Sequence, residues 1–230
     1  MLSRVRTIAG LSRRRAGGWL CRKSKWALLR GRDPVCLYAG NLPVSERYDK
    51  FVGLSLWKHD DRHVRHDVRR RLDLPAGFVD VYQAEDVFEH IERGRLPGVI
   101  ADIHRVLKPG GVFRLAVPDY RCDLLAARCR RDGQGRIVFD PGGGGEFRKS
   151  RVVGGGHLWF PVYESVRALL EESPFRDSFT FFHYYDEDGK AVLRPIDYAV
   201  GYVKRTPDHD PRVQNPFRPL SIVVDAVKRA

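Results

Sequence analysis

Residues 80–118 decide the fold of this chain, and they read DVYQAEDVFEHIERGRLPGVIADIHRVLKPGGVFRLAVP. The apolar run 79–83 enters an acidic turn and predicts a buried strand. Pro97 suits the first turn of a helix, and Gly110 marks its end. Between them, apolar residues recur at helical spacing at Val99, Ile100, Ile103, Val106 and Leu107. A second apolar run, 112–117, follows, so the stretch predicts one strand–helix–strand unit.

Further strands and one further helix are predicted on both sides of this unit. Pro161 opens a second helical pattern that runs over 162–170. The other predicted strands lie at 35–39, 51–54, 64–68, 179–184 and 221–227. Strands that alternate with helices on this scale predict an α/β fold with a mostly parallel seven-stranded sheet and helices on both faces.

The positive charge of the chain is concentrated at its beginning. The 230 residues carry a net charge of +12, but residues 1–32 hold ten Lys and Arg and no acidic residue. Residues 33–230 are therefore nearly neutral, and nucleic-acid binding by the domain is not indicated. We expect a basic N-terminal arm over 1–32 and one domain over 33–230, with an irregular insertion at about 120–160.

The basic arm allows three interpretations. Trp19, Trp26 and Leu29 follow helical spacing around Lys23, and such a helix can lie on an anionic membrane surface. The same helix could instead pack on the edge of the domain. An Arg-rich start without acidic residues is also typical of mitochondrial transit peptides. No apolar stretch is long enough to span a membrane, and no secretory signal is evident, so a cytoplasmic protein is expected, with peripheral contact at the inner face of the membrane.

The cysteines give no indication of a metal centre. Cys21, Cys36, Cys122 and Cys129 lack the C-x-x-C spacing of zinc sites. We expect reduced thiols and no bound metal.

A ligand of an open parallel sheet binds where the strands end, so the turn after the first strand is informative. Gly40 occupies that turn and lets the backbone approach a ligand, although an ordinary tight turn would also use glycine. The cluster Gly142–Gly145 lacks the Lys of a P-loop and is expected to be a flexible loop.

Several segments together resemble a known family. Gly40, Asp67 and Asp80 follow or begin the predicted strands, and they are joined by Glu89-His90 and by the segment RVLKPGG at 105–111. In this order they resemble the class I S-adenosylmethionine-dependent methyltransferases of the type that carries Glu-His and RVLKPGG segments. The resemblance implies a Rossmann-like fold and S-adenosylmethionine as the cofactor.

The resemblance also implies where the cofactor lies. Asp67 would accept hydrogen bonds from the adenine amino group, although a turn cap would use the same residue. Glu89-His90 could equally be a surface helical pair. The implied cofactor-binding residues are Tyr38, Ala39 and Gly40 at the glycine turn, Asp67 at the adenine, and Gln83, Ala84, Glu85 and His90 near the methionine end.

The chain departs from the family pattern in two places. The family has a Gly-x-Gly turn, whereas Gly40 is followed here by Asn41, Leu42 and Pro43. In addition, no acidic residue follows the second strand to hold the ribose hydroxyls. Ser55 is the residue there that could bind one hydroxyl, more weakly than a carboxylate.

Methyl transfer to oxygen needs a group that accepts a proton. His157, between three glycines and two aromatic residues, is the catalytic candidate, although it could instead cap the helix that starts near Pro161. Asp119, at the end of the fifth strand, is the second catalytic candidate, with Tyr120 and Arg121 holding the acceptor.

The resemblance thus implies an O-methyltransferase that acts on a glycan or another small or lipid-linked acceptor. The alternative, based on the two departures, is a catalytically inactive scaffold with the same fold.

Overall fold

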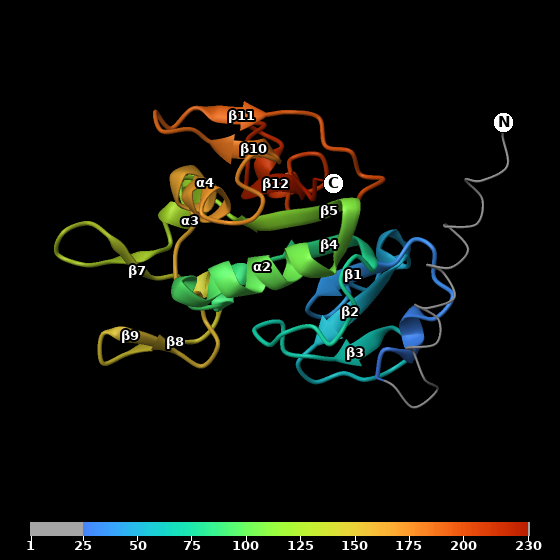
Figure 1. Cartoon of the computed structure of the whole chain (residues 1–230). Coiled ribbons are helices and arrows are strands. Elements are labelled where there is room, and N and C mark those ends of the chain that lie inside the picture. Colours follow the sequence, from blue (N-terminus) through green and yellow to red (C-terminus); the bar gives the residue numbers. More distant parts are fainter. Residues whose placement is uncertain (1–24, 230) are drawn as a thin grey trace, which may run out of the picture.

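A computed structural model describes residues 25–229 of the chain. Its centre is an eight-stranded sheet with the order β11-β10-β12-β5-β4-β1-β2-β3 (Figure 1). The strands are β1 (Cys36–Ala39), β2 (Phe51–Ser55), β3 (His63–Arg65), β4 (Val79–Glu85), β5 (Leu107–Pro118), β10 (Phe179–Tyr185), β11 (Ala191–Leu193) and β12 (Ser221–Val227).

The first five strands are parallel, and β12 lies antiparallel between β5 and β10. The mostly parallel sheet is therefore confirmed, with β11 as one strand more than expected. The chain runs outward from β1 to β3 on one side and then returns to β4 and β5 on the other. The gap between the ends of β1 and β4 is thus the topological switch point, where open parallel sheets bind ligands.

Two helices cover one face of the sheet. Helix α2 (Leu96–Val106) buries Val99, Ile100 and Ile103 on the strands, as its apolar spacing predicts. Helix α4 (Tyr163–Glu171) buries Val166, Leu169 and Leu170 in the same core. Both lie in front of the sheet in Figure 1, where α2 crosses β4 and α4 lies beside β10.

The opposite face is covered by irregular chain, whereas the sequence predicted helices on both faces. Tyr48, in the short turn η2 (Glu46–Tyr48), packs on Tyr38 and Phe51. Val203 packs on Ala116 of β5. Pro43, Pro195 and Gly201 interrupt these covering segments, so they bury side chains without forming a helix.

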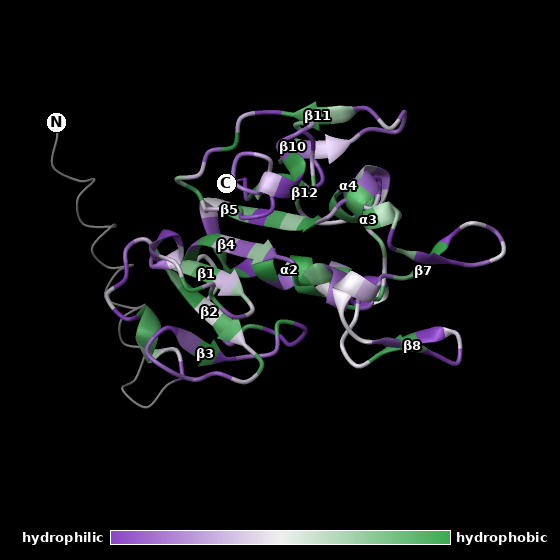
Figure 2. Cartoon of the chain, turned by 180° about the vertical axis from the view of Figure 1, so that it is seen from behind, coloured by the Kyte–Doolittle hydropathy of each residue, from purple (hydrophilic) through white to green (hydrophobic). Residues whose placement is uncertain are grey.

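Between β5 and α4 the chain forms two small hairpins. They consist of β6 (Arg130–Arg131) with β7 (Ile137–Phe139), and β8 (Glu146–Arg148) with β9 (Arg151–Val153). The short helix α3 (Asp123–Ala126) precedes them, and η5 (Pro141–Gly143) joins them. Figure 1 shows both hairpins projecting from one end of the sheet. Hydrophobic residues lie mainly in the strands and helices, and the connecting loops are largely hydrophilic (Figure 2).

The described part of the N-terminal arm is packed on the domain. Trp26 and Leu29, around η1 (Ala27–Leu29), are each 1% exposed and belong to the main core. This matches the interpretation of a segment packed on the edge of the domain, and Trp19 and Lys23 lie outside the described residues. Across residues 25–229, no helix is long and apolar enough to cross a membrane.

Candidate active site

A cavity of about 340 Å³ lies at the ends of β1–β4, at the switch point of the sheet. Its size falls in the range of about 300–1,000 Å³ that is typical of ligand pockets. Each of the strands β1–β4 contributes residues from its end or from the loop after it. The main lining residues are Gly40, Leu54, Asp67, Asp86, Val87, His90 and Gly155.

The turn after β1 is built around one glycine. Gly40 has a φ of +95°, and a Cβ added there would lie 3.4 Å from Cγ2 of Val87 across the cavity. The backbone N–H of Leu42 donates to Nε2 of His63 at 3.0 Å. The His63 ring fits because it packs against Gly53, where a Cβ would lie 2.5 Å from its Cδ2. His63 of β3 therefore holds in place the turn that the family pattern forms with a second glycine.

Asp67 is held in a defined position at the edge of this cavity. Its carboxylate accepts a bidentate pair of hydrogen bonds from Arg69, at 2.8 and 2.9 Å. Hydrogen bonding to Arg69 keeps the pKa of Asp67 below its usual value, so the carboxylate stays ionised. Oδ1 also accepts the backbone N–H of Arg69 at 3.0 Å, and Oδ2 lies 3.2 Å from its Nε, so an adenine amino group would have to share an oxygen with Arg69.

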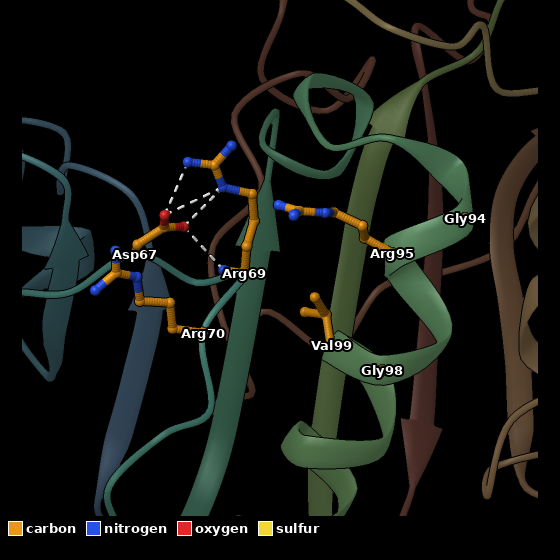
Figure 3. A pocket seen from close by; sticks show the side chains of 7 residues that line it. All are labelled: Asp67, Arg69, Arg70, Gly94, Arg95, Gly98 and Val99. Carbon is orange, nitrogen blue, oxygen red and sulfur yellow. Dashed lines mark hydrogen bonds and ion pairs between the residues drawn. The ribbon is translucent and has the colours of Figure 1, made fainter.

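The Asp67–Arg69 pair also borders a second, more open cavity of about 570 Å³. Figure 3 shows the hydrogen bonds from Arg69 to Asp67. The side chain of Arg95, the residue before α2, extends toward this pair. The pair therefore separates the cavity at the strand ends from a basic surface outside it.

Ser55 does not replace the missing acidic residue after β2. Its hydroxyl oxygen accepts the backbone N–H groups of Trp57 and Lys58, at 3.1 and 2.9 Å, and the residue is 1% exposed. The acidic residue that does line the cavity besides Asp67 is Asp86, which pairs with Arg205 at 2.8 Å.

Gln83, Ala84 and Glu85 do not line this cavity, contrary to the sequence expectation. The Gln83 side chain donates to the Tyr202 carbonyl at 2.6 Å, and Ala84 is in the core. Oε1 of Glu85 accepts the backbone N–H of Lys204 at 2.7 Å. Strand β4 extends to Glu85, two residues beyond the predicted end, so the cavity begins only at Asp86.

Tyr38 and Ala39 are also structural. Ala39 is completely buried, and the Tyr38 hydroxyl donates to Oε2 of Glu85 at 3.4 Å. The Tyr48 hydroxyl donates to the same oxygen at 3.0 Å. Burial raises the pKa of Glu85 to about 7. The three polar side chains therefore form a buried cluster on the far face of the sheet, away from the cavity.

His157 lies beside the cavity rather than in its wall. It is 5% exposed, and its Nδ1 contacts the Tyr120 hydroxyl. That hydroxyl donates to Asp140 at 2.7 Å, and Asp140 also accepts two hydrogen bonds from Arg128, so Tyr120 has only its lone pairs left for His157. The imidazole therefore carries its proton on Nδ1, and no cap on the helix near Pro161 is formed by this side chain.

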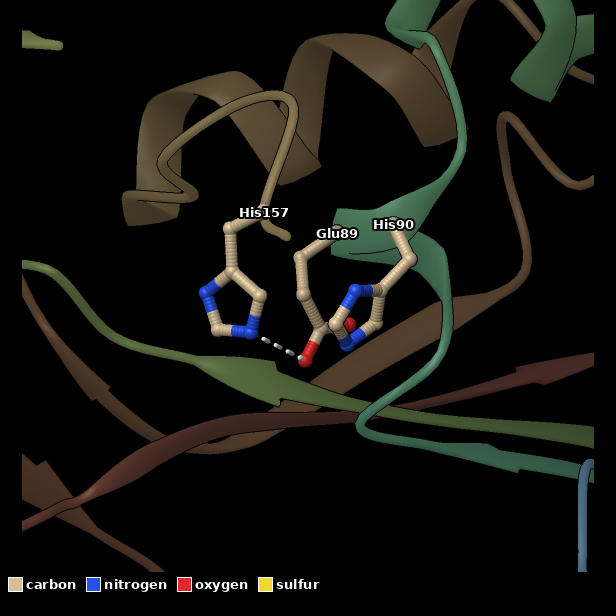
Figure 4. Close-up of side chains that lie close together, drawn as sticks. All are labelled: Glu89, His90 and His157. Atoms are coloured by element: carbon tan, nitrogen blue, oxygen red, sulfur yellow. Dashed lines mark ion pairs between the residues drawn. The ribbon is translucent and has the colours of Figure 1, made fainter. Parts of the chain in front are cut away.

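Glu89 and His90 lie next to His157 (Figure 4). Nδ1 of His90 donates to the Gly155 carbonyl at 2.9 Å, and its ring lies 4.6 Å from that of His157. Nε2 of His157 lies 3.7 Å from Oε1 of Glu89, which is completely buried and so is no surface pair. Burial raises the pKa of Glu89 well above its usual value and lowers the pKa of His157 to about 4. No spacing in the sequence indicated that Glu89 meets His157.

Asp119 is buried outside the cavity wall. Its carboxylate accepts the backbone N–H groups of Arg121 and Tyr185, at 3.0 and 2.8 Å. Burial raises its pKa to about 6. The Arg121 side chain pairs with Glu164 at 2.6 Å, so Asp119 and Arg121 both hold the chain after β5 in place.

Residues 46–115 match the family model of a methyltransferase domain. They contain β2–β4, α2 and most of β5, but not β1 or Gly40. This part of the chain is similar to methyltransferase domains. The cavity at the switch point and the open turn at Gly40 fit S-adenosylmethionine, the cofactor that the resemblance implies.

Similar solved structures include an S-adenosylmethionine-dependent methyltransferase from Mesorhizobium loti, with 17% identity, 84% of this chain and 90% of that chain covered, and a TM-score of 0.47. A methyltransferase of the same cofactor dependence from Archaeoglobus fulgidus has 15% identity, 95% and 94% coverage, and a TM-score of 0.47. The 1,6-didemethyltoxoflavin-N1-methyltransferase of Burkholderia thailandensis, solved with 1,6-didemethyltoxoflavin and S-adenosylhomocysteine, has 17% identity, 96% and 83% coverage, and a TM-score of 0.44. No curated protein matches the chain.

Proposed function

We propose that this methyltransferase transfers the methyl group of S-adenosylmethionine to a hydroxyl oxygen of a small acceptor, and that a sugar, free or lipid-linked, is the acceptor class. The cofactor would occupy the cavity at the ends of β1–β4, with its adenine toward Asp67 and its methionine end toward Asp86 and His90. Methyl transfer from a sulfonium mainly requires alignment of acceptor, methyl group and sulfur.

The proposal that the methyl acceptor is an oxygen atom rests on the position and tautomer of His90. His90 lines the cavity, and its Nδ1–H is engaged by the Gly155 carbonyl. Its Nε2 is therefore an unprotonated nitrogen at the cavity edge, able to accept a hydrogen bond from an acceptor hydroxyl. A hydroxyl is a poor nucleophile until such a group accepts its proton. His157 and Asp119 would position the surrounding loops and would not touch the acceptor.

A basic and aromatic surface beside the cavity supports a lipid-linked or anionic acceptor. Trp57 is 78% exposed and lies with Leu56 at a groove of about 560 Å³. The basic residues of this groove are Lys25, Arg65, Arg69, Arg70 and Arg71. Tryptophan next to Arg and Lys is the composition that binds anionic membrane surfaces, and the ten basic residues of 1–32 add to the charge. Peripheral contact through this groove would bring the cavity close to lipid-linked sugars.

Methyl-labelled S-adenosylmethionine and a panel of sugars, lipid-linked sugars, amines and carboxylates test the acceptor. We expect a labelled methyl ether on a sugar hydroxyl, and turnover reduced by about 100-fold or more in His90→Gln. Transfer to amines or carboxylates alone would contradict the choice of oxygen.

Sedimentation of the full chain with vesicles tests the membrane contact separately. Vesicles with anionic lipid should carry the protein down at low salt, and neutral vesicles should not. Equal binding to both kinds of vesicle would contradict an electrostatic contact.

A further inference from the structure

Glu89, His90 and His157 bring one side-chain ligand atom each to a common point, with these atoms within 4.8 Å of one another. Glu89 and His90 come from the turn η3 (Phe88–His90) after β4, and His157 comes from the loop before α4. Figure 4 shows the three side chains converging, with Nε2 of His157 directed at an oxygen of the Glu89 carboxyl group. The three residues adjoin the cofactor cavity, whose wall includes His90.

The hydrogen bonds around the cluster leave the two rings without a free proton donor. The Nδ1–H groups of His90 and His157 are used by Gly155 and Tyr120, so each ring turns an unprotonated Nε2 to the remaining space. Neither carboxylate oxygen of the completely buried Glu89 has a hydrogen-bond partner among residues 25–229. When Glu89 is ionised, three groups of acceptor atoms thus face one another, an arrangement that is costly to bury unless a proton or a metal ion joins them.

We propose that Glu89, His90 and His157 bind a divalent metal ion of the Zn²⁺ type. Two imidazole nitrogens and one carboxylate form a ligand set that suits zinc, cobalt and related ions better than magnesium or calcium. Nε2 of His157 is 3.7 Å from Oε1 of Glu89, so both can reach one ion at about 2.1 Å with only a small adjustment.

The surroundings have the form of a built metal site. A ligating histidine normally donates its other ring N–H to a carbonyl, a carboxylate or another polar group, which fixes the tautomer. Here the Gly155 carbonyl accepts it from His90, and the Tyr120 hydroxyl, backed by Asp140, accepts it from His157. The ligand atoms are therefore already oriented toward the shared point.

The backbone on both sides of the cluster is also fixed. The N–H of Leu158 donates to the carbonyl of Glu89 at 2.7 Å, and Nε1 of Trp159 donates to the carbonyl of Phe88 at 2.9 Å. These bonds join the loop of His157 to η3 without the ion. Metal binding therefore requires no large movement of the loop.

Three protein ligands leave a fourth position open, as in catalytic rather than structural zinc sites. If the proposed function holds, this position would receive the acceptor oxygen beside the cofactor, and the ion, in place of a direct hydrogen bond to Nε2 of His90, would lower the pKa of its hydroxyl. The metal site itself depends only on the three residues. Neither the cysteine spacing nor any short motif predicted it, because His157 is distant from Glu89-His90 in the sequence.

The test uses the full-length protein after treatment with a chelator. Co²⁺ is added stepwise, visible d–d absorption reports coordination, and Zn²⁺ is then added as a competitor. We expect one Co²⁺ per chain, displaced by Zn²⁺, and binding weakened by at least about tenfold in Glu89→Gln and in His90→Gln. His104→Gln, at a half-buried histidine packed on Phe175 away from the cluster, should bind as the unchanged protein does.

Circular dichroism and thermal melting establish that each variant is folded, and His90 is only half-buried, so its replacement leaves the core intact. Absence of Co²⁺ and Zn²⁺ binding by the folded unchanged protein would overturn the proposal. So would binding that is the same in Glu89→Gln, in His90→Gln and in the unchanged protein. S-adenosylhomocysteine binding is measured on the same metal-free samples, and its absence would count against the proposed function and not against the metal site.

Discussion

Burial of Asp119 disfavours the ionised form of its carboxyl group. Asp119 is 0% exposed, and burial raises its pKa from 3.8 to about 6. Between about pH 4 and pH 6 the unfolded chain loses this proton before the folded chain does. The contribution of Asp119 to stability is therefore fully present below about pH 4 and is lost as the pH rises to about 6. The loss is about 3 kcal/mol at most, at about 1.4 kcal/mol per pKa unit.

Asp119→Asn removes this titration and keeps the shape of the side chain. We predict that the free energy of unfolding of the unchanged protein, minus that of Asp119→Asn, decreases as the pH rises from about 4 to about 6. Urea denaturation at several pH values measures both proteins. A difference that is constant, or that grows with pH, would contradict the raised pKa.

Gly143 makes room for the ring of His157. A Cβ at this position would lie 2.6 Å from Cγ of His157, closer than side-chain carbons approach. Gly143→Ala should push the ring away from Tyr120 and cost about 1–3 kcal/mol of stability. Gly133→Ala is the matched control, because no atom lies within 4 Å of the added Cβ. Equal melting temperatures of the two variants would show that the His157 ring is not packed on Gly143.

At the scale of the elements, the segment around η1 is part of the domain core. Trp26 is 1% exposed, whereas Trp57 after β2 is 78% exposed. We predict that Trp26→Ala lowers the free energy of unfolding by about 3–5 kcal/mol. Trp57→Ala should change it by no more than about 0.5 kcal/mol. Urea denaturation of both variants measures this contrast, and a small effect of Trp26→Ala would mean that the segment does not stabilise the domain.

The sequence was sufficient for the elements with a strong apolar period. Helix α2 buries the residues whose spacing predicted it except Leu107, which begins β5, and β4, β5 and β12 are apolar runs. The covering of the second face could not be predicted, because Tyr48 and Val203 are single anchors in irregular chain. The hairpins between β5 and α4 are too short to show a period of two.

The candidate site could be predicted only where it follows directly from strand ends. Gly40 and Asp67 line the cavity because the ends of parallel strands meet at one edge. Gln83–Glu85 were placed wrongly because β4 is longer than its apolar run. The contact of Glu89 with His157 depends on how two loops pack, which no local pattern encodes.

At the scale of the whole molecule, one buried ion pair joins β5, β12 and the segment that covers the second face of the sheet. Arg114 of β5 is 0% exposed and makes a bidentate pair with Asp225 of β12, at 2.6 and 2.7 Å. It also donates to the carbonyls of Asp197 and Gly201 in the covering segment. Removing the carboxylate alone would leave a buried cation without its counter-charge.

We predict that Asp225→Ala lowers the free energy of unfolding by about 3–5 kcal/mol. The double variant Arg114→Met with Asp225→Ala should be less unstable than the sum of the two single variants, because it leaves no unpaired charge. Urea denaturation of the four proteins measures the coupling. Strictly additive losses would contradict an energetically coupled pair.

The central claim is that the cavity at the ends of β1–β4 binds S-adenosylmethionine with Asp67 at its adenine end. Calorimetric titration of the full chain with S-adenosylhomocysteine tests it most directly, with Asp67→Asn as the variant. Asp188→Asn, at an exposed position in the β10–β11 turn, is the control. We predict saturable binding by the unchanged protein and the control, weakened by about 10- to 100-fold in Asp67→Asn, since a hydrogen bond to a charged group contributes about 1.5–3 kcal/mol. Binding that is absent from the unchanged protein, or unaffected by Asp67→Asn, would contradict the account.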